Sequence, residues 1–207
     1  MTLETLGVHH VLTMDLHSDV IGGFFQRANV DYLYARPVFV SYFKEFFKDE
    51  LKKDELIVVS PDAGGVVRAQ SYAKRLMHRA DLAIIHKERD IPNEVARMKL
   101  AGDVAGKVAL IIDDMFDTCG TVGRAVDLLV QNGAKEVYGA ATHGIFSGDA
   151  LSLIEKSAIK RVFVTDTISY AAESPKVEYI SVGEIFGDAI RRIENDQSLS
   201  ALFEVDD

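Results

Sequence analysis

The sequence predicts an α/β domain with a mainly parallel sheet flanked by helices. Three observations support this fold class. Short apolar runs of strand length recur along the 207 residues, helical patterns separate several of them, and most of the runs lack strict polar–apolar alternation. Strands that alternate with helices are joined by right-handed crossovers, so neighbouring strands become parallel and both faces of the sheet are covered.

The elements can be assigned in chain order. Strands are expected at 11–16, 56–60, 82–86, 108–113, 136–142 and 161–165. The clearest helix begins near Gly120, because its apolar residues recur every three or four positions, and it ends at Asn132-Gly133, a typical stop signal. Two further helices are expected at about 64–79 and 183–194.

Residues 87–103 break this alternation. They are rich in charged side chains and have little apolar periodicity, which indicates either a long exposed loop or an excursion of two edge strands. Loops this long are uncommon inside compact domains and are often functional. We therefore expect a long mobile loop at about 87–105.

The composition limits the class of protein. With 48% hydrophobic and 27% charged residues, the chain can form one sizeable domain, and it contains no apolar run long enough to span a bilayer. Its single cysteine, Cys119, fits a reducing compartment, so we expect a cytoplasmic protein. The formal net charge of −9 argues against a nucleic-acid partner.

Polar clusters follow four of the predicted strands. Ligands of an open parallel sheet bind outside the carboxyl ends of its strands, so we expect these clusters to meet at one edge. They are DLH at 15–17, SPDAGG at 60–65, HKER at 86–89 and DDMFDTCGT at 113–121.

The cluster at 113–121 has the chemistry of a two-ended site. The helix that begins near Gly120 directs free N–H groups and its positive dipole end outward, which suits a phosphate. Asp113 and Asp114 precede this turn and could accept hydrogen bonds from vicinal sugar hydroxyls or share a divalent cation. The alternative is that Asp117 caps the helix and the acid pair is a solvated turn.

The other clusters are less specific by themselves. Gly64 and Gly65 permit a close approach of the backbone to a ligand, and Asp62 could hold a cation, although a loop that only needs positive φ would also contain glycines. His17 could be an ordinary hydrogen-bonded residue at a strand end, and the cations at 86–89 could be solvated.

Together, however, these motifs resemble one family. IIDDMFDTCGT is similar to the ribose 5-phosphate and PRPP-binding loop of type I phosphoribosyltransferase-fold proteins. With TMDLH, VVSPDAGGVVRA, AIIHKER and THGIFSG, in this order, the whole chain resembles the ribose-phosphate pyrophosphokinases, also called PRPP synthetases. The resemblance implies one phosphoribosyltransferase-like catalytic domain over residues 1–207, and that the family's N-terminal domain is not part of the chain.

The resemblance also implies the reaction and its site. The reaction would be the Mg²⁺-dependent transfer of the β,γ-diphosphoryl group of ATP to the 1-hydroxyl of ribose 5-phosphate, giving PRPP and AMP. Asp113 and Asp114 would hold the ribose hydroxyls, and Lys87 and Arg89 would stabilise the transferring group. The 5-phosphate would bind to Asp117, Thr118, Cys119, Gly120 and Thr121. The loop that binds the pyrophosphate would be Asp62, Ala63, Gly64 and Gly65. The residues on the side of the metal ion would be His17, Asp62 and Asp15.

Two further expectations come from the resemblance. Ser198 and Ser200 match serines of the family's allosteric phosphate site, but Asp19 adds a carboxylate there that should repel phosphate. A homo-oligomer is expected, dimer-based and hexameric in the family. The rival interpretations are a noncatalytic PRPP-synthetase-associated subunit or inactive fragment, and a nucleobase phosphoribosyltransferase.

Overall fold

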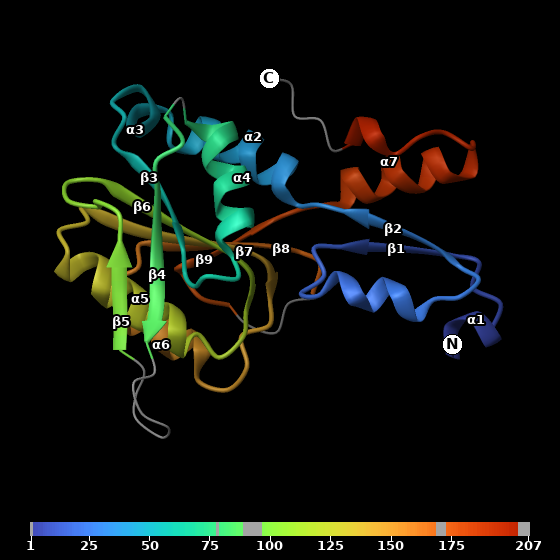
Figure 1. Ribbon diagram of the computed structural model, residues 1–207, viewed down its shortest axis with the longest axis horizontal. Coiled ribbons are helices and arrows are strands. Elements are labelled where there is room, and N and C mark those ends of the chain that lie inside the picture. Colours follow the sequence, from blue (N-terminus) through green and yellow to red (C-terminus); the bar gives the residue numbers. More distant parts are fainter. Residues whose placement is uncertain (1, 78, 89–96, 169–172, 203–207) are drawn as a thin grey trace.

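A computed structural model describes residues 2–77, 79–88, 97–168 and 173–202, and it confirms the α/β class (Figure 1). The main sheet has seven strands in the order β5-β4-β3-β6-β7-β8-β9. Neighbouring strands are parallel except β4 and β5, which are antiparallel. Their bounds are β3 Leu56–Ser60, β4 Leu82–Glu88, β5 Arg97–Ala101, β6 Val108–Phe116, β7 Glu136–Gly144, β8 Arg161–Thr165 and β9 Val177–Ile180.

Helices cover both faces of this sheet, which explains why its strands are apolar throughout. Val58 and Leu110 pack on one side in a core with α2 (Arg36–Phe46), α4 (Val66–Leu76) and α7 (Gly183–Glu194). Their neighbours Ile57 and Ile111 point to the opposite side, where α5 (Gly120–Gln131) and α6 (Ala150–Lys156) form a second core. Figure 1 shows the two helical layers above and below the sheet.

The direction of winding reverses between β3 and β6. The chain leaves β3 through α4 and enters β4 on one side, whereas it leaves β6 through α5 and enters β7 on the other. The carboxyl ends of these two adjacent parallel strands therefore open into a crevice flanked by two helix N-termini. Such a reversal is where open α/β sheets bind ligands.

The N-terminal part forms an arm beside the main sheet (Figure 1). The strand predicted at 11–16 is β1 (His10–Met14), and it pairs in parallel with β2 (Asn29–Leu33) in a separate two-stranded sheet rather than joining the main one. Between them lies the 3-10 helix η1 (Asp19–Phe24), and α1 (Thr2–Thr5) precedes them. The expectation that all four polar clusters follow strands of one sheet is therefore wrong for the first cluster.

Several elements were not predicted. The largest is α2, which begins with Arg36-Pro37 and buries Phe39 and Phe43, with the Phe43 ring against Phe163 of β8. Proline in the first helical turn and apolar residues three and four apart are the local signals for it. The others are α1, η1, α3 (Lys48–Lys52), α6, β2, β9 and the 3-10 helix η2 (Ser200–Leu202).

The predicted helices agree with α4, α5 and α7 to within a few residues. In the segment predicted as a long loop at about 87–105, residues 87–88 extend β4 and residues 97–101 form the antiparallel edge strand β5, as the two-strand alternative expected. Residues 89–96 lie outside the described residues. Within the described parts of the chain, no helix is long and apolar enough to cross a bilayer.

Candidate active site at the carboxyl edge of the sheet

Asp113 and Asp114 lie at the crevice, near the end of β6. Asp114 is buried, with 4% of its surface exposed, because β6 is an interior strand of the sheet. Backbone N–H groups orient both side chains: the Asp114 amide donates to Asp113 Oδ1 at 2.9 Å, and the Met115 amide donates to Asp114 Oδ1 at 2.9 Å. The acid pair is therefore a fixed feature of the strand end, not the solvated turn of the alternative interpretation.

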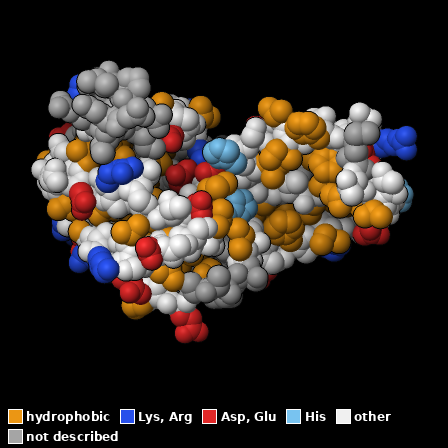
Figure 2. All heavy atoms as spheres, turned by 90° about the horizontal axis from the view of Figure 1, so that it is seen from below, with side chains coloured by type: hydrophobic (Ala, Val, Ile, Leu, Met, Phe, Trp, Pro, Cys, Tyr) orange, Lys and Arg blue, Asp and Glu red, His pale blue; other side chains and the backbone are white. Residues whose placement is uncertain are grey.

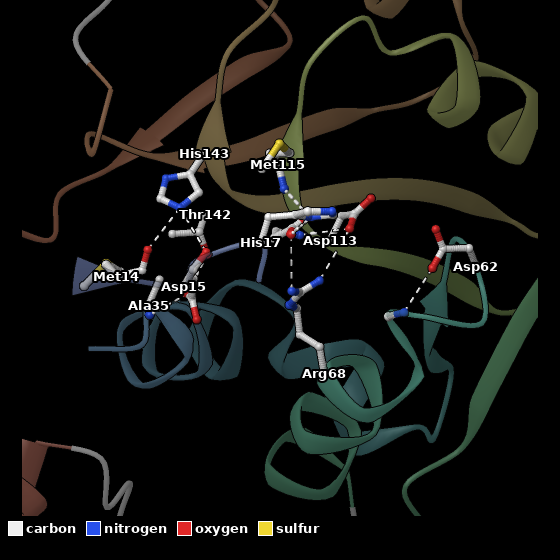
Figure 3. A network of polar contacts seen from close by, with 12 residues as sticks. Met14, Asp15, His17, Ala35, Asp62, Arg68, Asp113, Met115, Thr142 and His143 are labelled. Carbon is white, nitrogen blue, oxygen red and sulfur yellow. Dashed lines mark hydrogen bonds and ion pairs between the residues drawn. The ribbon is translucent and has the colours of Figure 1, made fainter. Parts of the chain in front are cut away.

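Two side chains from other elements converge on the acid pair (Figure 3). His17 follows β1 of the arm, and its Nδ1 lies 2.7 Å from Asp114 Oδ2. Arg68 lies in the first turn of α4, with Nη1 3.5 Å from Asp113 Oδ1 and Nη2 3.5 Å from Asp114 Oδ2. The arm and α4 thus both contribute to the acid pair on β6.

The two carboxyl groups titrate differently. Burial and the neighbouring Asp114 carboxyl raise the pKa of Asp113 to about 7. Burial also acts to raise the pKa of Asp114, but the hydrogen bond with His17 and the charge of Arg68 outweigh it and lower that pKa. Near neutral pH, Asp114 is therefore ionised while Asp113 can change its charge.

The turn at 117–121 forms an anion cradle next to the acid pair. Cys119 has φ 59°, a left-handed conformation that costs a non-glycine residue roughly 1–2 kcal/mol, and it turns the chain into α5. Among the described residues, none of the hydrogen bonds uses the N–H groups of Thr118 to Val122, so these groups remain available to a ligand. The Cys119 side chain itself points into the core, and burial raises the pKa of its thiol to about 12.

The turn at 62–65 lies across the crevice, before α4. Asp62 Oδ1 accepts a hydrogen bond of 3.0 Å from the Gly65 N–H, and the Ser60 hydroxyl donates to the Asp62 carbonyl at 2.7 Å. A Cβ on Gly65 would lie 3.0 Å from Ser60 Oγ, so glycine permits this close approach. Neither Gly64 nor Gly65 has the positive φ of the alternative interpretation.

Asp15 and His143 tie the arm to the main sheet at this edge (Figure 3). Asp15 Oδ2 accepts hydrogen bonds from the Ala35 N–H at 2.9 Å and from the Thr142 hydroxyl at 2.7 Å. His143 Nε2 lies 3.1 Å from the Met14 carbonyl oxygen and 3.2 Å from that of Asp15, so this nitrogen carries a proton. The sequence motif THGIFSG contains His143 but predicts no role for it; its place near the end of a strand is the local signal that it lies at this edge.

A cavity of about 390 Å³ opens beside His17 and Arg68, between the arm and α4. Asp15 and Gly64 line it too, which joins the first polar cluster to the second. The remaining lining residues include Asp19, Tyr32, Tyr34, Arg36, Val67, Ser71 and Tyr72.

The remaining predicted site residues are Lys87, Arg89, Ser198 and Ser200. Lys87 lies in β4, paired with Met98 of β5, and Arg89 lies outside the described residues. Ser198 and Ser200 are exposed near η2, where their hydroxyls lie 2.9 Å apart, and they do not line the cavity.

The site can hold a magnesium ion only together with a bound phosphorylated ligand. Among the described residues, no group of three or more His, Cys, Asp or Glu side chains could hold a metal ion by itself. Mg²⁺ does not need such a group, because it takes one or two carboxylates together with substrate phosphates and water. Asp62 can supply a carboxylate and the exposed His17 an outer contact, whereas Oδ2 of Asp15 already accepts two hydrogen bonds. The residues therefore fit a magnesium ion that arrives with a phosphorylated ligand.

Comparisons with known proteins agree with these motifs. The sequence profile of the phosphoribosyl synthetase-associated domain matches residues 89–204. The chain is 46% identical over 204 residues to ribose-phosphate pyrophosphokinase A of Dictyostelium discoideum, and 46% identical over 206 residues to ribose-phosphate pyrophosphokinase 2 of Schizosaccharomyces pombe. These matches cover 97% and 98% of this chain, but 62% and 63% of the relatives.

A solved structure shows the same relationship. The phosphoribosylpyrophosphate synthetase of Mycobacterium smegmatis superposes with a TM-score of 0.84 at 35% identity, covering 94% of this chain and 61% of that one. The chain thus spans about three fifths of the length of the relatives it matches. Its motifs, its fold and these matches together show that the chain belongs to the phosphoribosyl synthetase-associated domain family and is a homologue of the ribose-phosphate pyrophosphokinases, with a phosphoribosyltransferase-type fold.

Proposed function

We propose that the chain is the catalytic domain of a ribose-phosphate diphosphokinase, which transfers the β,γ-diphosphoryl group of ATP to ribose 5-phosphate. One observation carries this proposal: the acid pair and the free N–H groups at 118–122 lie next to each other on one strand–turn–helix unit. The first suits hydroxyls and the second suits a phosphate, so the unit matches the two ends of ribose 5-phosphate.

The nucleotide would lie on the opposite side of the crevice. The backbone turn at 62–65 faces the site with free N–H groups at Ala63 and Gly64, since among the described residues no hydrogen bond uses them. His17, whose side chain is 74% exposed, is placed to contact the nucleotide without leaving Asp114. Bound Mg²⁺ would neutralise phosphate charge, with Asp62 as its protein carboxylate.

The transfer needs no nucleophilic side chain. The 1-hydroxyl oxygen of ribose 5-phosphate bonds to the β-phosphorus while the bond from that phosphorus to the α,β-bridging oxygen breaks. AMP leaves with that oxygen, and the hydroxyl proton is released. The protein's part is to orient the two reactants and stabilise the developing charge, a role we assign to Lys87 and Arg89 by the family resemblance.

We also propose that the chain forms a homo-oligomer and is cytoplasmic, the latter on its single cysteine. The arm presents a cluster of exposed apolar side chains, visible at the right of Figure 2, that a second copy would cover. It comprises Leu3, Leu6, Val20, Ile21 and Phe24.

The test is to incubate the chain with ATP, Mg²⁺ and ribose 5-phosphate and to measure AMP. Formation of AMP and PRPP in equal amounts is expected, and the Asp113→Asn, Asp114→Asn double variant should lose it. Binding of ribose 5-phosphate without any AMP would favour the noncatalytic regulatory interpretation. Consumption of PRPP with a free nucleobase would favour the phosphoribosyltransferase interpretation.

A further inference from the structure

Arg68 connects α4 to both acids of the pair. Its two terminal nitrogens each lie 3.5 Å from a carboxylate oxygen, Nη1 from Asp113 and Nη2 from Asp114. Figure 3 shows the side chain rising from α4 toward the end of β6, across the point where the strand order reverses. One planar guanidinium thus spans two carboxylates that are adjacent in the sequence.

The buried charge of Asp114 explains why a cation is needed beside the acid pair. The Asp114 side chain is 6% exposed, and an ionised carboxylate at such a depth is costly unless charged partners and hydrogen bonds compensate it. Within the described residues, its side-chain ion-pair partners are Arg68 and His17. His17 belongs to the arm, so Arg68 is the contact that comes from the main sheet and its covering helices, as the acid pair does.

We infer that Arg68 is a positioning residue for the ribose hydroxyls, acting through Asp113 and Asp114. The inference rests on the proposed function. A guanidinium presents two donors in one plane and can face two carboxylate groups at once, whereas an ammonium is a single point charge. Arg68 therefore sets the relative orientation of the two carboxyl groups, so that their oxygens face a vicinal diol and can accept its hydrogen bonds.

A purely structural role for Arg68 makes a different prediction. If the side chain only stabilised α4 against the sheet, its removal would weaken binding of every ligand alike. If it acts on the acid pair, its removal should weaken only those ligands whose hydroxyls the pair recognises. Arg75 is a matched control, because it lies on the same helix, and its Nη1 contacts the Ser71 hydroxyl at 2.9 Å instead of the acids.

The experiment compares two sugars that share the phosphate but differ in one hydroxyl. Calorimetric dissociation constants for ribose 5-phosphate and 2-deoxyribose 5-phosphate would be measured for the wild type and for Arg68→Gln, Arg68→Lys and Arg75→Gln. We expect the wild type and Arg75→Gln to prefer the ribose by about tenfold or more, as for a hydrogen bond to a charged group. The preference should fall below about threefold in Arg68→Gln and remain below the wild-type value in Arg68→Lys.

Each contrary result has its own meaning. An Arg68→Gln variant that keeps the full preference would overturn the inference and leave the ribose assignment standing. An equal loss of affinity for both sugars would assign Arg68 a structural role only. A wild-type chain that binds both sugars alike would overturn the proposed ribose site, and the inference with it.

Discussion

Asp113 and Asp114 are neighbours in the chain but meet different surroundings. Asp114 is held in its charged form by Arg68 and His17, while burial and the neighbouring carboxyl raise the pKa of Asp113 to about 7. A carboxyl group whose pKa is far from its ordinary value is a frequent sign of a functional site. In the free protein its burial is not yet compensated by the contacts that a ligand would make. Here the ribose hydroxyls would add hydrogen-bond donors to those that Asp113 already receives from the Asp114 N–H and Arg68.

This arrangement predicts that the ionised Asp113 side chain lowers the stability of the folded protein. Its folded-state pKa of about 7 lies above the ordinary value of 3.8, so the native state holds the proton that the unfolded state has lost between these two pH values. Stability therefore falls as pH rises through this window, and the charged carboxylate destabilises the native state above it. Asparagine is neutral throughout, so Asp113→Asn should raise the melting temperature at pH 8 by about 2–4 °C, with a smaller gain at pH 5.

Thermal unfolding at the two pH values tests this prediction, with Asp127→Asn on the exposed face of α5 as the control. The Asp113→Asn variant should also bind ribose 5-phosphate more weakly in spite of its higher stability. Equal destabilisation of this variant at pH 5 and pH 8 would show that the charge of Asp113 carries no penalty.

At the scale of elements, a junction with the main sheet holds the arm next to the candidate active site. Asp15 adopts φ 42°, and this strained residue is held by the Ala35 amide and the Thr142 hydroxyl. His143 adds its hydrogen bonds to the Met14 and Asp15 carbonyls. The position of His17 therefore depends on β2, α2 and β7 as well as on its own strand.

Removing His143 should loosen this junction. We expect His143→Ala to lose about 1–3 kcal/mol of stability, because two carbonyl oxygens lose their donor. Amide hydrogen exchange should accelerate in residues 10–17 more than in β3 or β6. The exposed His9 gives the control variant His9→Ala, and uniform exchange across the arm and the sheet in both variants would contradict the proposed anchoring.

The β4–β5 edge is the second element with a predicted role. Lys87 is at the end of β4, where its backbone pairs with β5, and the family resemblance assigns its charge to the transition state. In a form of the protein that produces AMP, Lys87→Ala should lower turnover by about 100-fold or more. Its affinity for ribose 5-phosphate should stay within about twofold of the wild-type value. Lys74→Ala, on an exposed position of α4, is the control, and unchanged turnover in Lys87→Ala would refute the assigned role.

At the scale of the whole molecule, the arm leaves large apolar side chains in solvent. Leu6 is 77% exposed, and Val20 and Phe24 are each 70% exposed. A patch of this kind on one face is a common mark of an interface (Figure 2).

We expect the chain to sediment as a dimer or larger species at micromolar concentration. Phe24→Glu should shift it toward the monomer, because a charge in an apolar interface cannot be desolvated without a partner. Val130→Glu, at an exposed position of α5, should leave the distribution unchanged. A wild-type chain that sediments as a monomer would rule out the arm as a self-association surface under these conditions.

Local sequence patterns are enough to predict the α/β class, most strands of the main sheet, helices α4, α5 and α7, and the four polar clusters. These features depend on local periodicity and turn chemistry, which neighbouring residues encode. The cradle at 117–121 belongs to this group, because one strand–turn–helix segment contains all of it.

Which clusters meet, and through which contacts, depends instead on how the elements pack in three dimensions. Asp114 and His17 are 97 residues apart, and their 2.7 Å contact requires the separate arm, whose pairing of β1 with β2 has no local signal. The contact of Arg68 with both acids and the raised pKa of Asp113 also depend on elements that are distant in the sequence. Long-range contacts and burial arise from how whole elements pack, and no window of neighbouring residues contains that information.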